Sequence, residues 1–189
     1  MKKFYLLIVS LFIASSCIAS NYDLSQQATA FYSDNNHIRT MDVILQINEK
    51  DRTAQDWLLL GNVLADKNEQ ENALFMYQKA IEKDPKCYKA YYNIANYNVE
   101  KGQFNNAIEN YKKAAKIKTD NPYIYYNLAT VYIKQEEFGK AKTNLNKAIM
   151  YKSTVPEFHY NLAYVYKKLG KDKLAQTYLD NYNKLTEQN

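Results

Sequence analysis

Residues 88–121, YKAYYNIANYNVEKGQFNNAIENYKKAAKIKTDN, carry the pattern that decides the fold. In the first half, the small or apolar side chains with helical spacing are Tyr91, Ile94, Ala95 and Asn98. In the second half they are Ala107, Tyr111 and Ala114. Gly102 separates the two runs, and each run places its residues on one face of a helix. The stretch therefore predicts two amphipathic helices joined by a turn, which is a helical hairpin.

The same pattern recurs along the chain with a fixed step of 34 residues and no gap. The aligned sets are Trp57, Tyr91, Tyr125 and His159; Leu60, Ile94, Leu128 and Leu162; Gly61, Ala95, Ala129 and Ala163; and Ala73, Ala107, Ala141 and Ala175. A fixed period of this length indicates stacked structural units rather than one globular core. Stacks of helical pairs present extended surfaces that bind other chains.

The repeat resembles the tetratricopeptide repeat (TPR), whose pattern is W-x2-L-G-x2-Y, then A-x3-F, then P. The first unit matches it with Trp57, Leu60, Gly61, Leu64, Ala73, Tyr77 and Pro85. This resemblance implies an all-α fold, a right-handed α-solenoid of stacked helical hairpins. The four expected units are residues 54–87, 88–121, 122–155 and 156–189.

Two departures from the family pattern affect the ends of units. The closing proline is present only as Pro85, but Pro122 and Pro156 stand where the next helices begin, a position that tolerates proline. Tyr182 replaces the small residue of the earlier units. Because no further unit follows, we expect the polar last helix to cap the stack.

Residues 21–53 lie outside the regular repeat. Apolar residues on either side of a turn at residues 34–36 suggest a degenerate helical hairpin, and a linker before the repeats is the alternative.

Residues 1–20 have the layout of an export signal. Lys2 and Lys3 precede an apolar run at residues 4–14. This run is too short to span a bilayer as a helix but is typical of a signal peptide.

The sequence Ala-Ser-Ser-Cys at residues 14–17 resembles a bacterial lipobox, which favours cleavage before Cys17 and lipidation of that cysteine. Cleavage after Ala19 or Ser20, and an uncleaved anchor, are the alternatives. By resemblance to lipoprotein sorting in some bacteria, Ile18 favours the outer membrane. We therefore expect an exported, membrane-anchored lipoprotein that faces the periplasm or the outside.

The charge of the chain is modest and uneven. The formal net charge is +5. By our count of charged residues, residues 18–87 are acidic, whereas residues 88–189 are basic. This asymmetry can orient a partner or favour acidic ligands, and solvated helix faces are the alternative reading.

The first helix of each unit lines the inner groove in TPR proteins. By this resemblance, the peptide-binding groove consists of Asn62, Tyr92, Asn93, Asn96, Tyr126, Asn127, Thr130, Tyr160, Asn161 and Tyr164. Leu58 takes the place of Tyr92 in the first unit. Asparagine amides can donate and accept hydrogen bonds, so they can hold an extended peptide backbone, and tyrosine adds apolar area. Binding at the convex side or at the N-terminal hairpin is the alternative.

The sequence contains no pattern that indicates catalysis. The four glycines are isolated, so no phosphate-binding loop is present, and no Cys or His pair has metal-ligand spacing. Nor does any nucleophile stand beside an activating base. We therefore expect no enzyme activity, no cofactor, no metal and no small-molecule substrate.

These observations predict a non-catalytic adaptor or scaffold of the bacterial cell envelope with protein partners and a lipid anchor. TPR lipoproteins of this type resemble secretin pilotins and outer-membrane assembly adaptors. One alternative is a surface-exposed lipoprotein that binds a host protein. Another is nucleic-acid binding through the Tyr- and Lys-rich second and third units, which the modest charge and the export signal oppose, so we expect no nucleic acid.

Overall fold

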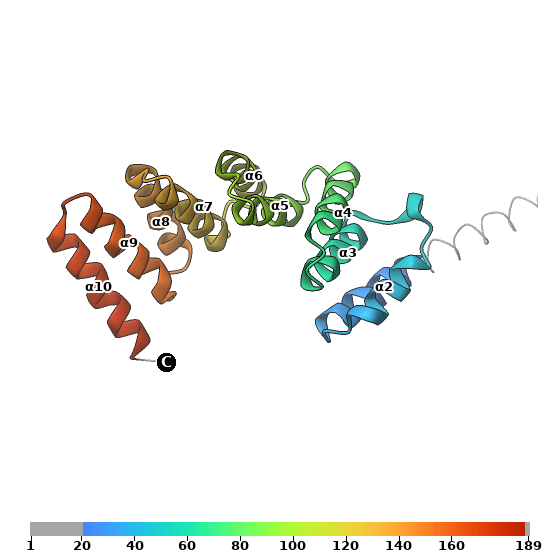
Figure 1. The fold of residues 1–189 in the computed structure, drawn as a ribbon. Helices are drawn as coiled ribbons and strands as arrows, with labels where there is room; N and C mark the ends of the chain where they lie inside the picture. The colour runs from blue at the N-terminus through green and yellow to red at the C-terminus, as the bar shows by residue number, and fades with distance from the viewer. Residues whose placement is uncertain (1–20, 188–189) are drawn as a thin grey trace, which may run out of the picture. The chain divides into compact units, whose positions relative to one another are not determined.

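The computed structural model describes residues 21–187, and every regular element in this range is a helix (Figure 1). After a helix at residues 21–33 come α2 (His37–Leu45), η1 (Glu49–Asp51), α3 (Ala54–Asp66), α4 (Gln70–Lys83), α5 (Tyr88–Glu100), α6 (Phe104–Ile117), α7 (Pro122–Lys134), α8 (Phe138–Tyr151), α9 (Pro156–Lys168) and α10 (Asp172–Thr186). The all-α class and the stacking of helical hairpins are confirmed. The expected signal segment at residues 1–20, with Cys17, lies outside the described residues.

The helices α3 to α10 form four hairpins, whose first helices begin at Ala54, Tyr88, Pro122 and Pro156. The chain divides after Pro85 into two compact units, the N-terminal unit and the C-terminal unit. Between residues 21 and 187, none of the helices combines the length and the apolar character that a membrane span needs.

The N-terminal unit contains the helix at residues 21–33 together with α2, α3 and α4. The Asn36 side chain caps α2 by accepting a hydrogen bond from the Arg39 amide. The carboxylate of Asp66 at the end of α3 accepts a hydrogen bond from the Tyr32 hydroxyl at 3.3 Å and lies 3.3 Å from the His37 imidazole. Residues 21–45 are therefore a helical pair that contacts α3.

A capping box fixes the start of α3. The Thr53 hydroxyl accepts a hydrogen bond from the Asp56 amide, and the Asp56 carboxylate accepts one from the Thr53 amide at 2.7 Å. The residue before this cap also contacts α3: the Arg52 guanidinium stacks on the Trp57 ring at 5.0 Å from its centre.

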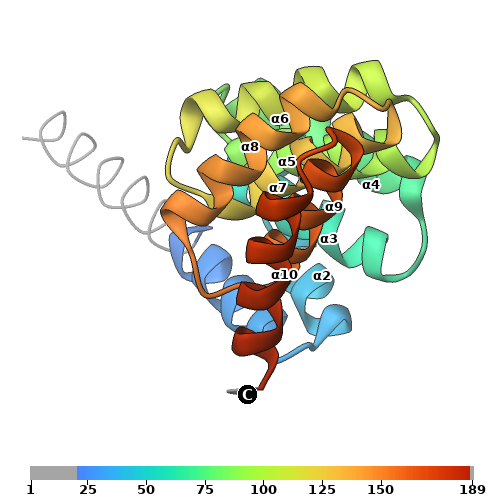
Figure 2. The same ribbon diagram turned by 90° about the vertical axis from the view of Figure 1, so that its left-hand side faces the viewer.

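The C-terminal unit consists of the pairs α5–α6, α7–α8 and α9–α10, which follow one another along the chain (Figure 1). Both helices of each pair carry a buried alanine of the repeat pattern: Ala95 and Ala107, Ala129 and Ala141, and Ala163 and Ala175. Small residues at these positions let the helix axes approach closely. One hydrophobic cluster runs through all three pairs, and α10, nearest the viewer in Figure 2, is the last element of the unit.

The turn inside each hairpin has the same backbone geometry in all four cases. The residue in the left-handed region is Asn68, Gly102, Glu136 or Gly170, with φ of 63°, 70°, 58° and 69°. The next amide reaches back to a carbonyl of the preceding helix, as Glu137 N does to Tyr132 O at 2.8 Å. This is the Schellman arrangement that ends helices, and glycine suits it best because it has no Cβ.

Candidate protein-binding face

The structure brings nine of the ten sequence-predicted groove residues onto adjacent helices of the C-terminal unit. These residues, here called the first-helix face, are Tyr92, Asn93 and Asn96 of α5; Tyr126, Asn127 and Thr130 of α7; and Tyr160, Asn161 and Tyr164 of α9. The tenth, Asn62, lies on α3 in the N-terminal unit. Hydrogen bonds between the first helices show that α5, α7 and α9 are neighbours in this order.

Two asparagines of this face join one hairpin to the next. The Asn127 side-chain amide donates a hydrogen bond to the Tyr92 hydroxyl at 2.7 Å. One unit further on, the Asn161 amide donates to the Tyr126 hydroxyl at 3.1 Å. An asparagine side chain has two donors and one carbonyl acceptor, so each amide keeps hydrogen-bonding capacity after making this bond. These asparagines therefore hold the stack together as well as lining its face.

A second asparagine position, present in the first two hairpins, joins the two helices of each of them. The Tyr111 hydroxyl of α6 donates to the Asn96 side-chain oxygen of α5. In the N-terminal unit, the Tyr77 hydroxyl of α4 donates to Asn62 of α3 at 3.1 Å. The sequence pattern did not reveal these bonds, because they depend on where the tyrosine of the second helix points.

Burial keeps the tyrosines of this network neutral. Burial raises the pKa of the Tyr92 hydroxyl, and hydrogen bonds from Asn96 and Asn127 offset part of that rise. The pKa of Tyr126 is raised for the same reason, with Asn161 in the offsetting role. A neutral hydroxyl that accepts a bond from asparagine still has its own proton to donate, so both phenols can donate to a ligand.

Exposure increases along the face towards the end of the chain. Tyr92 and Tyr126 are half-buried, whereas the side chains of Tyr160 and Tyr164 are 52% and 43% exposed. In the N-terminal unit the expected groove position Leu58 is buried, so its assignment to an open groove was wrong. Leu58 lies on α3, which α2 contacts, and an apolar side chain is most stable in such a packed position.

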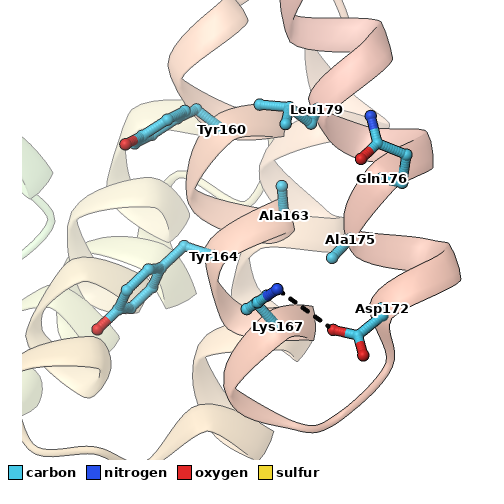
Figure 3. Close-up of a pocket in the computed structure, with 8 residues that line it drawn as sticks. All are labelled: Tyr160, Ala163, Tyr164, Lys167, Asp172, Ala175, Gln176 and Leu179. Atoms are coloured by element: carbon cyan, nitrogen blue, oxygen red, sulfur yellow. Dashed lines mark ion pairs between the residues drawn. The ribbon is translucent and has the colours of Figure 1, made fainter.

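A pocket of about 310 Å³ lies between α9 and α10 (Figure 3). Ala163 and Ala175 face each other across it, Tyr164 borders it on one side, and Gln176 and Leu179 border it on the other. At its end, the Lys167 ammonium lies 3.7 Å from the Asp172 carboxylate. Sequence reasoning missed this pocket, because the pattern of one unit does not show which surfaces neighbouring helices cover.

A second cavity, of about 370 Å³, lies in the N-terminal unit among α2, α3 and α4. Its apolar lining includes Met41, Leu45, Phe75 and Met76. Leu45 and Phe75 are also exposed, and neither belongs to the repeat positions that sequence reasoning used.

The lysines of the C-terminal unit are not confined to the first-helix face. Lys113 of α6 pairs with Glu109 at 2.7 Å, and Lys140 of α8 pairs with Glu137. The side chain of Lys168, on α9, stacks over the Tyr164 ring at 5.6 Å from its centre. Positive charge is therefore spread over several helix surfaces.

No group of His, Cys, Asp and Glu side chains among residues 21–187 has the arrangement of a metal site. His159, which stands at the repeat position of Trp57, Tyr91 and Tyr125, is buried. Its Nε2 lies 2.8 Å from the Ser153 carbonyl, as the Tyr125 hydroxyl lies 2.8 Å from the Thr119 carbonyl one unit earlier. His159 thus does the structural work of the repeat aromatic.

Solved structures with the same fold include MamA and PilF. The chain has a TM-score of 0.77 with a double mutant of MamA from RS-1, at 14% identity over 89% of this chain and 96% of that chain. A crystal structure of MamA gives a TM-score of 0.75 at 20% identity, over 85% and 95% of the two chains. PilF of Pseudomonas aeruginosa gives 0.77 at 18% identity, over 89% of this chain and 78% of that chain. At such identities the likeness shows the fold alone.

A comparison with curated protein sequences found no match. Family models described as TPR repeat or tetratricopeptide repeat match residues 56–87, 76–109, 96–136, 129–170 and 156–189. These matches run without a gap through all four hairpins, and TPR domains are characteristically protein-interaction scaffolds. The chain therefore belongs to the tetratricopeptide repeat family.

Proposed function

We propose that the chain is a non-catalytic adaptor of the bacterial cell envelope, which binds a segment of a partner protein on the first-helix face. The observation that carries the proposal is the exposure of two tyrosines, Tyr160 and Tyr164, beside a row of asparagines that keep hydrogen-bonding capacity. The family and the fold of the MamA and PilF structures support a scaffold role.

The chemistry of this face suits a peptide backbone. Asn127 and Asn161 are held in place by their bonds to tyrosines, so little side-chain entropy is lost when they bind a ligand. Tyr160 and Tyr164 offer large apolar rings with few rotatable bonds, a combination that is favoured at protein interfaces. Selectivity then comes from the side chains of the partner segment that contact these rings.

The location in the envelope rests on the sequence of residues 1–20. A lipid on Cys17 places the chain at a membrane surface and leaves the repeats outside the bilayer. Replacing Cys17 by Ser tests this part of the proposal. We expect the variant to lose labelling by a palmitate analogue and to leave the membrane fraction; unchanged labelling and fractionation contradict lipidation at Cys17.

The two alternative functions differ in the partner. Binding to a host protein requires that the repeats are exposed on the cell surface. Removal of the repeats by protease treatment of intact cells favours this alternative. The positions of Lys113 and Lys140 in ion pairs give little support to nucleic-acid binding, because these two charges lie on second helices and not on the first-helix face. Binding to single-stranded nucleic acid with a steep dependence on salt supports that alternative instead.

Two matched substitutions test the binding face. Thr130 lies in the middle of the face on α7, and Thr143 lies exposed on α8; each hydroxyl donates to a backbone carbonyl of its own helix. We expect Thr130→Arg to block the face and Thr143→Arg to leave it open. The full chain and both variants are used to capture proteins from detergent-solubilised cells, and bound proteins are identified by mass spectrometry.

The expected result is an envelope protein that the wild-type chain and Thr143→Arg retain and that Thr130→Arg loses at least tenfold. Circular dichroism checks that both variants remain folded. Equal capture by Thr130→Arg places the partner on another surface and overturns the assignment of the first-helix face.

A further inference from the structure

The last hairpin differs from the two before it because no described helix follows it. We call its open surface the end face, which consists of Tyr160, Ala163 and Tyr164 on α9 and Ala175, Gln176 and Leu179 on α10 (Figure 3). In the hairpin before it, the equivalent surface is covered by α9. The end face is a different surface from the first-helix face, although Tyr160 and Tyr164 border both.

The chain itself shows what covers such a surface. In the third hairpin, Ala129, Ala141 and Leu145 belong to one hydrophobic cluster with Leu162 and Val165 of the following helix α9. All five of these side chains are 0% exposed, including Ala129, Ala141 and Leu145, which are the equivalents of Ala163, Ala175 and Leu179 of the end face. An amphipathic helix with Leu and Val at these positions therefore fits the surface of a hairpin.

The end face is open in one half and closed in the other. In the third hairpin, Phe158 of the following helix lies against Ala148, and its ring is 4.9 Å from the Tyr126 ring. In the last hairpin, Tyr182 replaces Ala148, and its ring is 5.2 Å from the ring of Tyr160. The last hairpin thus has this aromatic contact from its own Tyr182, whereas the third hairpin receives it from Phe158 of the following helix.

The other half of the end face lacks such a cover. It contains the pocket of about 310 Å³ between Ala163 and Ala175. Leu179, the equivalent of fully buried Leu145, is partly exposed here, and Tyr164 is 43% exposed. The open half is an exposed apolar surface, whereas the other half is covered by Tyr182. An exposed apolar surface of this kind indicates a binding site, here for a ligand that fits into the open half alone.

We propose that the end face binds an amphipathic helix of another protein, in the position that the first helix of a further repeat would occupy. The partner helix carries Leu, Ile or Val at the positions of Leu162 and Val165 and fills the pocket with them. At the position of Phe158 it carries a small residue, because the Tyr182 ring already stands there. An asparagine at the position of Asn161 can donate to the Tyr160 hydroxyl, as Asn161 itself does to Tyr126.

The charges beside the pocket add a preference. The end of α9, the following turn and the start of α10 are basic together: they carry Lys167, Lys168, Lys171 and Lys173, with Asp172 as the single acid. A partner helix with acidic side chains at this end gains electrostatic complementarity and a faster association.

A size exchange tests the proposed register. The probe is a fluorescein-labelled peptide with the sequence of residues 154–170, the chain's own cover for a hairpin surface, in which Lys167 and Lys168 are replaced by Glu to match the basic end of the pocket. It is made in two forms, one otherwise unaltered and one with Phe158→Ala. Each form is titrated with the full chain in detergent solution and with its Tyr182→Ala variant, and binding is followed by fluorescence anisotropy. We expect the alanine peptide to prefer the wild-type chain and the unaltered peptide to prefer Tyr182→Ala, each by about tenfold.

Two neighbouring substitutions on α10 locate the site. Gln176 lines the pocket and Thr177 does not, and both are exposed. Gln176→Trp is expected to weaken binding at least tenfold, whereas Thr177→Trp leaves it unchanged. The proposal is overturned by the absence of saturable binding in all four combinations, by binding that Gln176→Trp does not weaken, or by preferences that do not reverse between the two peptides.

Discussion

Single asparagine side chains perform two tasks on the first-helix face. Asn127 and Asn161 donate to tyrosines of the preceding hairpin, and the same amides face the surface on which we propose that a partner binds. At the residue scale, stability and recognition therefore share side chains. Substitutions on this face must be judged by their effect on the free energy of unfolding before their effect on binding is interpreted.

The bond between Asn127 and Tyr92 is expected to contribute about 1 kcal/mol to the free energy of unfolding. Asn127→Ala and Tyr92→Phe each remove it, so the double variant should be destabilised by less than the sum of the two single variants. Chemical denaturation of all four chains measures this coupling. Tyr160→Phe is the control for the loss of a tyrosine hydroxyl without a hydrogen bond, because within residues 21–187 no hydrogen bond of the Tyr160 hydroxyl is found. If the effects of Asn127→Ala and Tyr92→Phe are strictly additive, the assignment of the bond between these residues is contradicted.

Gly61 is expected to resist substitution because of the ring of Tyr77. A Cβ added at Gly61 would lie 2.5 Å from a ring carbon of Tyr77, which is 4% exposed. Gly61→Ala should therefore lower the free energy of unfolding by about 1–3 kcal/mol, as overpacking does. The third unit has Ala129 and Leu145 at the positions of Gly61 and Tyr77. Adding Tyr77→Leu to Gly61→Ala should therefore recover part of the lost stability, as measured by thermal denaturation. A Gly61→Ala variant as stable as the wild type shows instead that α3 and α4 can separate without cost.

At the scale of elements, the hairpin turn is the most uniform feature of the chain. All four turns use one left-handed residue followed by the same backward hydrogen bond, but only two of them use glycine. Asn68 tolerates this conformation better than most residues, whereas Glu136 does not. Local strain at Glu136 is therefore built into the third hairpin.

Glu136→Gly is expected to raise the free energy of unfolding by about 0.5–1 kcal/mol, because glycine adopts the left-handed conformation without steric cost. The reverse change, Gly102→Ala, should lower it by a similar amount. Urea denaturation measures the free energy of unfolding of both variants, which should change in opposite directions relative to the wild type. A Glu136→Gly variant less stable than the wild type means that a contact of the glutamate outweighs the strain.

Buried tyrosines between paired helices give stability a dependence on alkaline pH. Burial raises the pKa of Tyr92, Tyr111 and Tyr126 above the value of about 10 for an unfolded chain. The folded state therefore binds more protons than the unfolded state above that pH, and the free energy of unfolding falls as the pH rises further. Below about pH 10 the contribution of these tyrosines is fully present.

Denaturation at a series of pH values from about 8 to 11 measures this slope. Tyr111→Phe removes one of the contributing groups, so its stability should fall less steeply than that of the wild type. Lysines titrate in the same range in both chains and cancel in the comparison. Equal slopes contradict the view that the Tyr111 phenol is kept neutral by the fold.

At the scale of the whole chain, the sequence predicted the fold better than the site. The fixed period through Trp57 and its equivalents was sufficient for the hairpins, because small and large residues alternate at the same packing positions in every unit. The resemblance to TPR proteins, applied in register with this period, named the side chains of the first-helix face. It could not show that Asn127 is bonded to Tyr92 or that Leu58 is buried, since both depend on contacts between different helices.

The end face also depends on more than the pattern of one unit. The replacement of a small residue by Tyr182 was visible in the sequence, but the contact of its ring with Tyr160 needed the three-dimensional arrangement. The end face lies where the last unit differs from the units before it. A periodic sequence shows which positions the units share. The role of a residue that departs from the period becomes clear only when its neighbours in the structure are known.

Crosslinking inside the cell tests most directly whether a partner protein lies on the first-helix face. A photoreactive amino acid is introduced at Thr130 on the face and, in a separate chain, at Thr143 on the outside of α8. After illumination of intact cells, we expect position 130 to give one discrete adduct with another envelope protein and position 143 to give none. Adducts from position 143 alone, or the same adduct from both positions, contradict the account.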